Sequence, residues 1–370
     1  MKVVVISANT SWYLYNFRKN TILSLIRDGY EVIAVAPRDS YTQKLESLGC
    51  KYHHIRIDQG GTNPILDFMT LIYFIVIYNR LKVDLVLNFT PKNNIYSTLA
   101  AKVNNAKVVN NIAGLGTIFT KNTISSKIAK LLYKFSQKYA DLIFFQNEDD
   151  RRIFSEMKVA EKVITDRLPG SGVDLNRFQI KEAPNDGRVK FLLIARMLYE
   201  KGISQYVEAA RILKEKYSNL DFRLLGFLDV DNPSAVSQNQ MNEWSAEGVV
   251  DYLGVSDSVE KEIADVDCMV LPSYYREGVP KSLLESAAMG KPIVTTDNVG
   301  CRETVNDNVN GFLCVPKSSE SLATALEKII KMSYQERLQM GAESRKKVEN
   351  EFDEKIVISK YLHIVNQLLI

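Results

Sequence analysis

The sequence predicts an α/β protein with two Rossmann-like domains, each built on a mostly parallel sheet covered by helices. Short apolar runs of strand length alternate with helical periodicity along most of the 370 residues. The alternation stops at a glycine-rich segment, Pro169 to Phe178, which a polar run follows, and then begins again. Such βα alternation is typical of parallel sheets, and the length allows two cores. We therefore expect two sheets that face each other across a cleft.

The predicted strands of the first half are short and apolar, and helical patterns separate them. The strands are Val3–Ser7, Glu31–Ala36, Tyr52–Ile57, Asp84–Phe89, Lys107–Asn111 and Asp141–Gln146. The helices lie near 17–28, 40–48, 65–80, 93–103, 122–139 and 148–157. We assign residues 1–168 to a first domain and residues 169–188 to a linker, because the linker is rich in glycine and polar residues.

The second half repeats the pattern, and we assign residues 189–350 to a second domain. Its predicted strands are Lys190–Ala195, Asp221–Leu225, Val249–Leu253, Cys268–Leu271, Pro292–Thr295 and Phe312–Val315. Its predicted helices lie near 202–217, 257–265, 281–289 and 318–331. Two amphipathic helical stretches follow from Ser333, the second over Asp353 to Leu369.

Composition indicates a soluble globular chain with an uneven distribution of charge. The hydrophobic fraction is 46%, the charged fraction 25% and the net charge +3. Residues 1–180 carry 24 basic and 15 acidic side chains, whereas the remainder carries 23 and 29. The basic first half suggests an anionic partner, although a chance asymmetry of a solvated surface is an alternative. The most apolar segment, Ile65 to Tyr78, is too short to span a bilayer and predicts a core helix.

One stretch, Asp267 to Asp297, predicts a ligand site. It has the pattern strand, polar loop, helix, turn, strand, and it places Glu277 at the carboxyl end of a strand and Glu285 in the helix. Helical spacing would separate these carboxylates by roughly 12 Å, which suits a nucleotide sugar between them. The helix start offers N–H groups to a diphosphate. A solvated helix face is the alternative.

Two cations follow the first strand of the second domain. Arg196 and Lys201 lie between that strand and a helix that begins after Gly202. A diphosphate leaving group needs positive charge where its own negative charge develops, and these side chains can supply it. Ordinary surface cations are the alternative.

Three features of the first half suggest contact with a ligand. A long aromatic loop after the first strand ends at Arg18, which we place at a helix start, where arginine and amides can hold phosphate, although an arginine that caps a surface helix is the alternative. Gly114 and Gly116 follow the fifth strand, where they let a ligand approach the backbone closely or only make a turn. A basic helical stripe suits anionic lipid headgroups, although a solvated helix face is an alternative. The stripe consists of Lys127, Lys130, Lys134 and Lys138.

These motifs resemble those of retaining glycosyltransferases of family four, which have the GT-B fold. The resemblance rests on Glu277-Gly-Val-Pro, Glu285 and Gly290-Lys-Pro-Ile-Val, and on the Arg-x-x-x-x-Lys-Gly pattern of Arg196 to Gly202. It implies catalytic roles for Glu277, Arg196 and Lys201. The donor residues that it implies are Glu285, Gly278, Val279, Lys281, Gly226, Val255 and Ser256. It also implies that residues 351–370 form a helix crossing back to the first domain.

The first half is similar to bacterial family members that add an N-acetylhexosamine to undecaprenyl-diphosphate-linked sugars. Tyr15-Asn-Phe-Arg18 is similar to a Tyr-x-Phe-Arg sequence of such enzymes, which implies contact with the acceptor diphosphate. The acceptor residues expected on this basis are Asn16, Arg18, Gly114, Gly116 and Lys92. Many family members place a histidine near the donor sugar from the loop after the fourth strand. Here that loop contains no histidine, and Lys92 or a backbone carbonyl is the expected substitute.

The sequence thus predicts a retaining, metal-independent transferase that moves a hexose or N-acetylhexosamine from a UDP-sugar to an undecaprenyl-diphosphate-linked saccharide. We expect no cofactor, no metal and no nucleic-acid partner, and a cytoplasmic location, peripheral on the inner face of the cell membrane. Two alternatives stay open. One is a nucleotide-sugar 2-epimerase with the GT-B fold. The other is a non-catalytic protein that binds nucleotide sugars.

Overall fold

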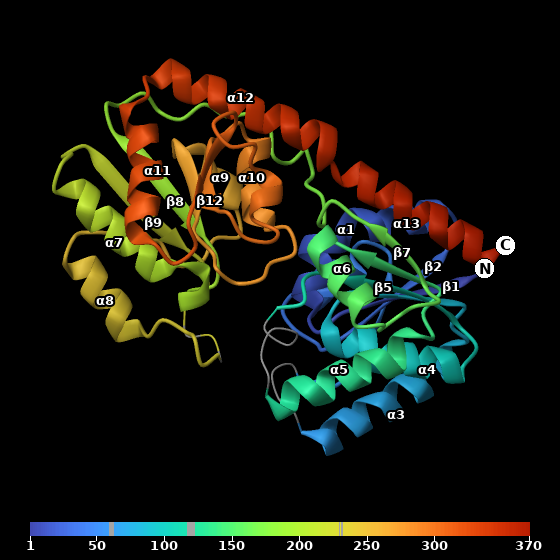
Figure 1. Cartoon of the computed structure of the whole chain (residues 1–370). Helices are drawn as coiled ribbons and strands as arrows, with labels where there is room; N and C mark the ends of the chain where they lie inside the picture. The colour runs from blue at the N-terminus through green and yellow to red at the C-terminus, as the bar shows by residue number, and fades with distance from the viewer. Residues whose placement is uncertain (59–62, 117–122, 229, 231) are drawn as a thin grey trace. The chain divides into compact units, whose positions relative to one another are not determined.

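The computed structural model describes the chain except residues 59–62, 117–122, 229 and 231. The described residues form two compact units (Figure 1). Unit 1 consists of Met1–Ser171 and Lys355–Ile370, and unit 2 consists of Gly172–Glu354. The chain therefore passes between the units after Ser171 and after Glu354, whereas the predicted linker spans 169–188 and the predicted last helix begins at 351.

Unit 1 contains a parallel seven-stranded sheet in the order β3-β2-β1-β4-β5-β6-β7. Its strands are β1 (Val3–Ser7), β2 (Glu31–Ala36), β3 (Lys51–His54), β4 (Leu85–Asn88), β5 (Lys107–Ile112), β6 (Leu142–Phe145) and β7 (Ile164–Arg167). The helices are α1 (Ser11–Arg27), α2 (Thr42–Glu46), α3 (Pro64–Leu81), the π-helix η1 (Asn93–Ser97), α4 (Thr98–Val103), α5 (Ile124–Gln137), α6 (Glu148–Glu156) and α13 (Glu354–Leu369). The strand order reverses between β1 and β4, which is a topological switch point.

Both faces of the unit 1 sheet are covered, as the continuous apolar strands require. Val5 and Val86 face a core that α3, η1, α4, α5 and α6 complete. Val4 and Ile6 face the opposite core, which contains α1 and α13. Tyr361 of α13 lies in this second core, with its ring centroid 5.2 Å from that of Phe144. The last helix of the chain is thus part of the interior of unit 1.

Unit 2 contains a parallel six-stranded sheet in the order β10-β9-β8-β11-β12-β13. Its strands are β8 (Val189–Ile194), β9 (Leu220–Leu225), β10 (Asp251–Tyr252), β11 (Cys268–Leu271), β12 (Ile293–Thr296) and β13 (Gly311–Cys314). The helices are the 3-10 turn η2 (Tyr199–Lys201), α7 (Ile203–Lys214), α8 (Gln238–Ala246), α9 (Val259–Ala264), α10 (Lys281–Ala288), the 3-10 turn η3 (Arg302–Thr304), α11 (Ser319–Lys331) and α12 (Tyr334–Glu351). The predicted α/β class with two parallel-sheet domains is confirmed.

Several predicted elements need correction. Helix α1 begins at Ser11 rather than near residue 17, because the Thr10 side chain accepts a hydrogen bond from the Tyr13 N–H and caps the helix. Strand β7 and helix α8 were not predicted, because both are largely polar. The predicted core helix at 65–78 is α3, but only one of its faces is buried. The prediction is therefore correct for that face and wrong for the other.

Candidate active site

The candidate site of unit 2 lies where its strand order reverses. Strands β8 and β11 are neighbours and parallel, and the chain leaves them toward opposite sides of the sheet. Ligands of open α/β sheets bind in the crevice at the carboxyl ends of such strands. The segment with Arg196 and Lys201 follows β8, and the loop with Glu277 follows β11. The topology thus brings these two segments to one edge of the sheet.

Lys201 and Glu277 form an ion pair between Nζ and Oε1, and both side chains are largely buried, with exposed fractions of 13% and 12%. The Ser273 hydroxyl donates to the same carboxylate oxygen at 2.9 Å. The ring centroid of Tyr275 lies 5.1 Å from the Lys201 ammonium, within the range of a cation–π contact. This is a preorganised pair of opposite charges in a partly dehydrated setting, where charges interact more strongly than in water.

Two glycines allow the backbone of neighbouring segments to approach the loop after β11 closely. A Cβ at Gly202 would lie 2.2 Å from the Pro272 carbonyl oxygen. A Cβ at Gly300 would lie 1.7 Å from the carbonyl oxygen of Gly278. Both glycines have a φ of +80°, a conformation that other residues rarely adopt. A side chain at Gly202 would push the Lys201 segment away from the loop after β11, and a side chain at Gly300 would push the Glu277 loop away from the segment after β12.

Strand β12 supports the Glu277 loop from the other side. The Asn298 amide donates to the Tyr275 carbonyl oxygen at 2.8 Å, and the Thr296 hydroxyl donates to the carbonyl oxygen of Ser273. Ser273, Asn298, Thr296 and Gly300 were not predicted as residues of the site. A glycine followed by polar residues after a buried strand was the available signal, but its contact partner lies more than twenty residues away in the sequence.

Glu285 and Lys281 form a second pair on α10. Their Nζ and Oε1 atoms are 3.9 Å apart, one helical turn from each other. Burial raises the pKa of Glu285, and the charges of Lys281 and then Arg177 oppose that shift. The charged groups that shift this pKa are Lys281 on the same helix, Arg177 and Glu260.

Arg196 has an exposed side chain, and among the described residues its guanidinium makes no hydrogen bond or ion pair. The charged side chains predicted for the donor site thus form a Lys201–Glu277 pair and a Lys281–Glu285 pair, while Arg196 is exposed to solvent. The N-cap residue of α10 is Pro280, whose side chain caps no N–H group. The amino end of a helix is a common binding position for an anion.

The remaining predicted donor residues lie at the carboxyl ends of β9 and β10 and in the Glu277 loop. Gly226 donates its N–H to the Gly254 carbonyl oxygen at 2.7 Å, so the loops after the two strands are joined. Val255 is 52% exposed, and the Ser256 hydroxyl accepts from the Ser258 N–H. Gly278 and Val279 are buried.

In unit 1 the structure corrects the placement of Arg18. It lies in the middle of α1 rather than at a helix start, and its side chain is 1% exposed. Its guanidinium stacks on Phe89 at 4.3 Å and lies 3.4 Å from the Tyr13 hydroxyl. Within the described residues its Nε and Nη1 have no hydrogen-bond partner. A buried, unpaired guanidinium is costly, which is a reason to look for an anionic partner.

The other predicted acceptor residues are placed as follows. Lys92 lies 2.5 Å from the Asp67 carboxylate, so its charge is already compensated and it is a poor substitute for a histidine. The Asn16 amide donates to the Trp12 carbonyl oxygen in α1. Gly114 and Gly116 follow β5, both with positive φ.

Metal ligation has little support in the described residues. They contain no group of three or more His, Cys, Asp or Glu side chains placed to hold an ion. Two Asp-x-Asp sequences occur in the chain. Asp265 and Asp267 are bonded to Arg223 and Arg337, whereas Asp229 and Asp231 lie outside the described residues. Metal independence therefore stays a prediction.

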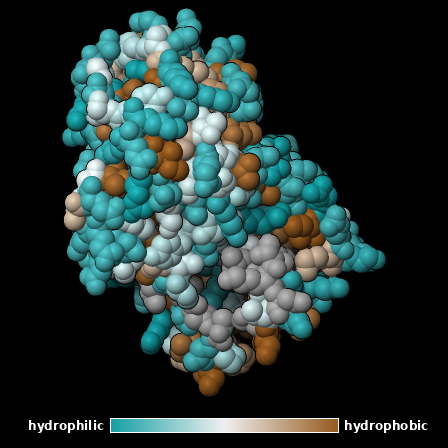
Figure 2. All heavy atoms as spheres, turned by 60° about the vertical axis from the view of Figure 1, so that its left-hand side comes forward, coloured by the Kyte–Doolittle hydropathy of each residue, from teal (hydrophilic) through white to brown (hydrophobic). Residues whose placement is uncertain are grey.

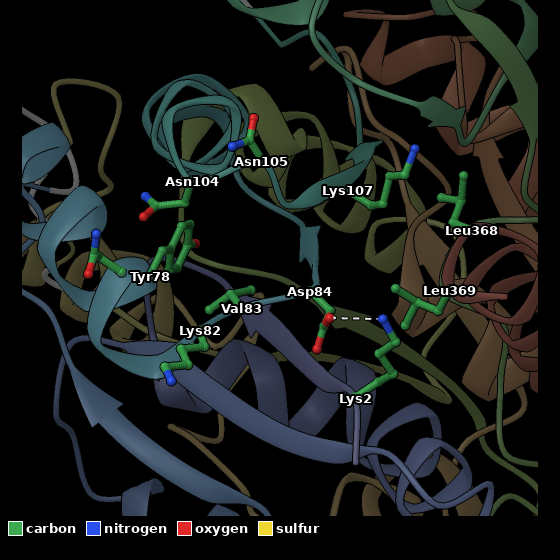
Figure 3. Close-up of a pocket in the computed structure, with 11 residues that line it drawn as sticks. Lys2, Tyr78, Lys82, Val83, Asp84, Asn104, Asn105, Lys107, Leu368 and Leu369 are labelled. Carbon is green, nitrogen blue, oxygen red and sulfur yellow. Dashed lines mark hydrogen bonds and ion pairs between the residues drawn. The ribbon is translucent and has the colours of Figure 1, made fainter.

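A cavity of about 550 Å³ in unit 1 lies elsewhere. Its lining includes Lys2, Val83 and Lys107, next to the amino ends of β1, β4 and β5 (Figure 3). Lys2 is paired with Asp84 at 3.2 Å, as the dashed line in Figure 3 marks. The amino end of a parallel sheet is not where such folds bind ligands, so we do not assign this cavity to the site.

Comparison with solved structures identifies the fold. Sucrose-phosphate synthase from Thermosynechococcus elongatus has a TM-score of 0.81 at 17% identity, over 100% of this chain and 99% of that chain. Anabaena HepE, solved in complex with UDP-glucose, has a TM-score of 0.80 at 16% identity, over 99% and 100% of the two chains. A family model described as Glycosyl transferase 4-like matches residues 2–147, and one described as Glycosyl transferases group 1 matches residues 176–347. This chain is a GT-B glycosyltransferase.

Two curated relatives of the transferase come from bacteria. It is 29% identical to the Campylobacter jejuni N,N'-diacetylbacillosaminyl-diphospho-undecaprenol alpha-1,3-N-acetylgalactosaminyltransferase, over 96% of each chain. It is 25% identical to the Escherichia coli UDP-Gal:alpha-D-GlcNAc-diphosphoundecaprenol alpha-1,3-galactosyltransferase, over 72% of this chain and 71% of that protein. The resemblance drawn from the sequence is confirmed at the level of family and fold.

Proposed function

We propose that this glycosyltransferase moves a hexose or N-acetylhexosamine from a UDP-sugar to an undecaprenyl-diphosphate-linked saccharide, with retention of anomeric configuration and without a metal ion. The reaction would take place at the cytoplasmic face of the cell membrane, in the assembly of a surface polysaccharide or glycan. The observation that carries the proposal is the buried Lys201–Glu277 pair at the strand switch of unit 2. The named substrates of the two relatives support the choice of donor and acceptor class.

In the proposed donor site, positive charges bind the diphosphate of the nucleotide sugar and a carboxylate binds its sugar. Lys201, Arg196 and the amino end of α10 would hold the diphosphate, which develops negative charge as it leaves. Glu277 would accept hydrogen bonds from hydroxyl groups of the sugar. The loops at Gly226 and Val255 would hold the nucleoside. The same cations replace the charge that a divalent metal supplies in metal-dependent transferases.

The proposed chemistry needs no nucleophile from the protein. An acceptor hydroxyl oxygen bonds to the anomeric carbon on the face that the leaving group departs from. The bond between that carbon and the phosphate oxygen breaks, and its electron pair stays on UDP. The acceptor proton passes to an oxygen of the departing phosphate. Positioning and charge stabilisation then account for the rate acceleration.

The test is transfer from a panel of UDP-sugars to lipid-diphosphate saccharides, with products identified by mass and anomeric configuration by NMR. Lys201→Ala and Glu277→Ala should each lower the transfer rate by more than about tenfold, equivalent to about 1.4 kcal/mol, while the protein stays folded. Lys216→Ala, which removes an exposed lysine of the same unit, is the matched control. Near-normal rates in either site variant would reject the assigned site.

The same experiment separates the alternatives. UDP release with an epimerised sugar and no transfer would support the 2-epimerase. Tight donor binding without turnover would support a non-catalytic protein. Transfer that is unchanged by EDTA would agree with the metal-independent mechanism, whereas loss of transfer that added magnesium restores would contradict it.

A further inference from the structure

Two helices of unit 1 carry apolar stripes that face away from its core. On α3 the residues of the stripe are between 42% and 70% exposed and recur at helical spacing. They are Ile65, Phe68, Met69, Ile72, Tyr73 and Val76. On α5 the corresponding residues are between 49% and 79% exposed. They are Ile124, Ile128, Leu131 and Phe135.

These stripes are additional to the faces that hold the helices on the sheet. Phe74, Ile77 and Tyr78 bury the opposite side of α3, and Tyr133 and Gln137 bury the opposite side of α5. A surface helix of a soluble protein normally presents polar residues outward. A cluster of large exposed apolar side chains on two helices therefore marks an interaction surface.

The two helices form one surface. Both pack on η1 and α4, and they lie side by side in Figure 1. Brown, hydrophobic groups stand at the foot of the view in Figure 2, at the end of unit 1 where α3 and α5 begin. We call the exposed residues of α3 and α5 the α3/α5 face.

The charges around this face are positive. Lys127, Lys134 and Lys138 of α5 are exposed, and Lys130 is partly exposed, on the side of the helix next to its apolar stripe. Helix α5 contains no acidic residue. The acid of α3, Asp67, turns inward to Lys92 and to the Tyr96 hydroxyl, at 2.5 and 2.9 Å. The α3/α5 face thus combines exposed apolar side chains with the positive charges of the α5 lysines.

We propose that the α3/α5 face docks on an anionic lipid bilayer, with its apolar side chains inserted among the headgroups and the α5 lysines on lipid phosphates. Interfacial helices have this combination of residues. Protein interfaces are depleted in lysine, and a twofold pairing of this face with a second copy would oppose like charges. The inference deepens the proposed function, and it rests on that function for the lipid-linked acceptor that makes a membrane the relevant surface.

The face lies on the membrane and does not span it. Helix α3 is long and apolar enough to cross a bilayer by length and composition alone. However, its ends join β3 and β4, which belong to one sheet, and its inner face is packed in the core of unit 1. A folded unit 1 therefore holds both ends of the helix on the same side.

The test is sedimentation of the full chain with vesicles of phosphatidylglycerol and phosphatidylethanolamine. Phe68→Ser with Ile72→Ser, and Leu131→Ser with Phe135→Ser, should each weaken vesicle binding by at least about tenfold at low and high salt. Val315→Ser, an equally exposed apolar residue of unit 2 at 61%, is the matched control and should bind as the wild type does.

Salt separates the two parts of the interaction. Lys130→Gln with Lys134→Gln should weaken binding by about tenfold at low salt and by less at high salt, because salt screens exposed charge. The wild type should retain part of its binding at high salt through the apolar stripe. Serine variants that bind vesicles as the wild type does would overturn the inference. So would a dimer in solution that the serine variants dissociate.

Transfer to a short-chain, water-soluble acceptor distinguishes this inference from the proposed function. The serine variants should transfer to that acceptor at the wild-type rate and lose transfer only to acceptor in vesicles. If the serine variants keep vesicle binding while transfer is present, the docking surface is wrong and the function stands. If no acceptor is glycosylated while the serine variants still lose vesicle binding, the function is wrong and the surface stands.

Discussion

The Lys201–Glu277 pair makes a specific prediction about nucleotide binding. In the free protein Glu277 forms an ion pair with the ammonium of Lys201, which we assign to binding of the donor diphosphate. UDP alone has no sugar for Glu277 to bind, so removal of the carboxylate would take no favourable contact away from UDP. Glu277→Gln keeps the shape of the side chain and hydrogen bonds to Lys201 and Ser273, and removes the negative charge. We therefore expect Glu277→Gln to bind UDP more tightly and to transfer sugar more slowly.

The size of the effect follows from the burial of the pair. A unit charge about 5–8 Å from a phosphate charge contributes about 1–3 kcal/mol at an effective dielectric constant of about 20–40. Both side chains retain some exposure, 13% and 12%, so screening reduces this energy. We expect about 1–2 kcal/mol, which corresponds to a Kd for UDP lower by roughly five- to thirtyfold.

Isothermal titration calorimetry with UDP measures the first effect, and initial rates measure the second. Glu215→Gln, which removes an exposed acid at the far end of α7, is the matched control and should leave the Kd unchanged within about twofold. Lys201→Met should weaken UDP binding. If Glu277→Gln bound UDP as the wild type does or more weakly, Glu277 would not compete with the diphosphate, and the proposed division of charges would be rejected.

Three further variants test other parts of the structure. Gly300→Ala places a Cβ 1.7 Å from a carbonyl oxygen and should lower the melting temperature and the transfer rate. The control is Gly187→Ala, where φ is similar but the space is open, and it should cause only a small loss of stability from backbone strain. Equal losses in the two variants would contradict the close-contact argument. Burial lowers the pKa of Lys291 to about 8, so the unfolded chain takes up this proton first as pH falls. The stability of the wild type relative to Lys291→Met should therefore fall by up to about 3 kcal/mol between about pH 10.5 and pH 8, and a difference in urea-unfolding midpoint that is independent of pH would refute this. Arg18→Met removes a buried guanidinium that has no ion partner among the described residues, so thermal stability should be kept or increased while transfer to a diphosphate acceptor falls by more than about tenfold. A loss of stability would indicate a structural role instead.

The predictable part of the site follows from topology. Lys201 and Glu277 each follow a buried apolar run, and parallel strands bring their carboxyl ends to one edge. The pairing of β8 with β11 was not predicted and comes from the structure. The contacts of Ser273, Asn298 and Gly300 were not predictable in the same way, because they depend on how loops from β11 and β12 pack, and no local pattern encodes that packing.

The errors have equally local causes. Arg18 was placed at a helix start because aromatic residues before it suggested a loop, whereas the Thr10 cap lets the helix begin at Ser11 and turns Arg18 inward. The segment 65–78 was assigned to the core because it is apolar on all sides. A helix of that kind gives no sign in its sequence of which face stays outside.

The position of Tyr361 has a consequence for biosynthesis. Its ring lies between Phe89 and Phe144, and its hydroxyl accepts a hydrogen bond from the Asn111 amide at 2.6 Å. A nascent chain that has left the ribosome up to residue 171 contains every strand of unit 1 but lacks this aromatic wedge. Unit 2 is complete earlier, since its residues are contiguous. Unit 1 is translated first but completes its core last, so part of its interior stays accessible to chaperones until the final helix has been translated.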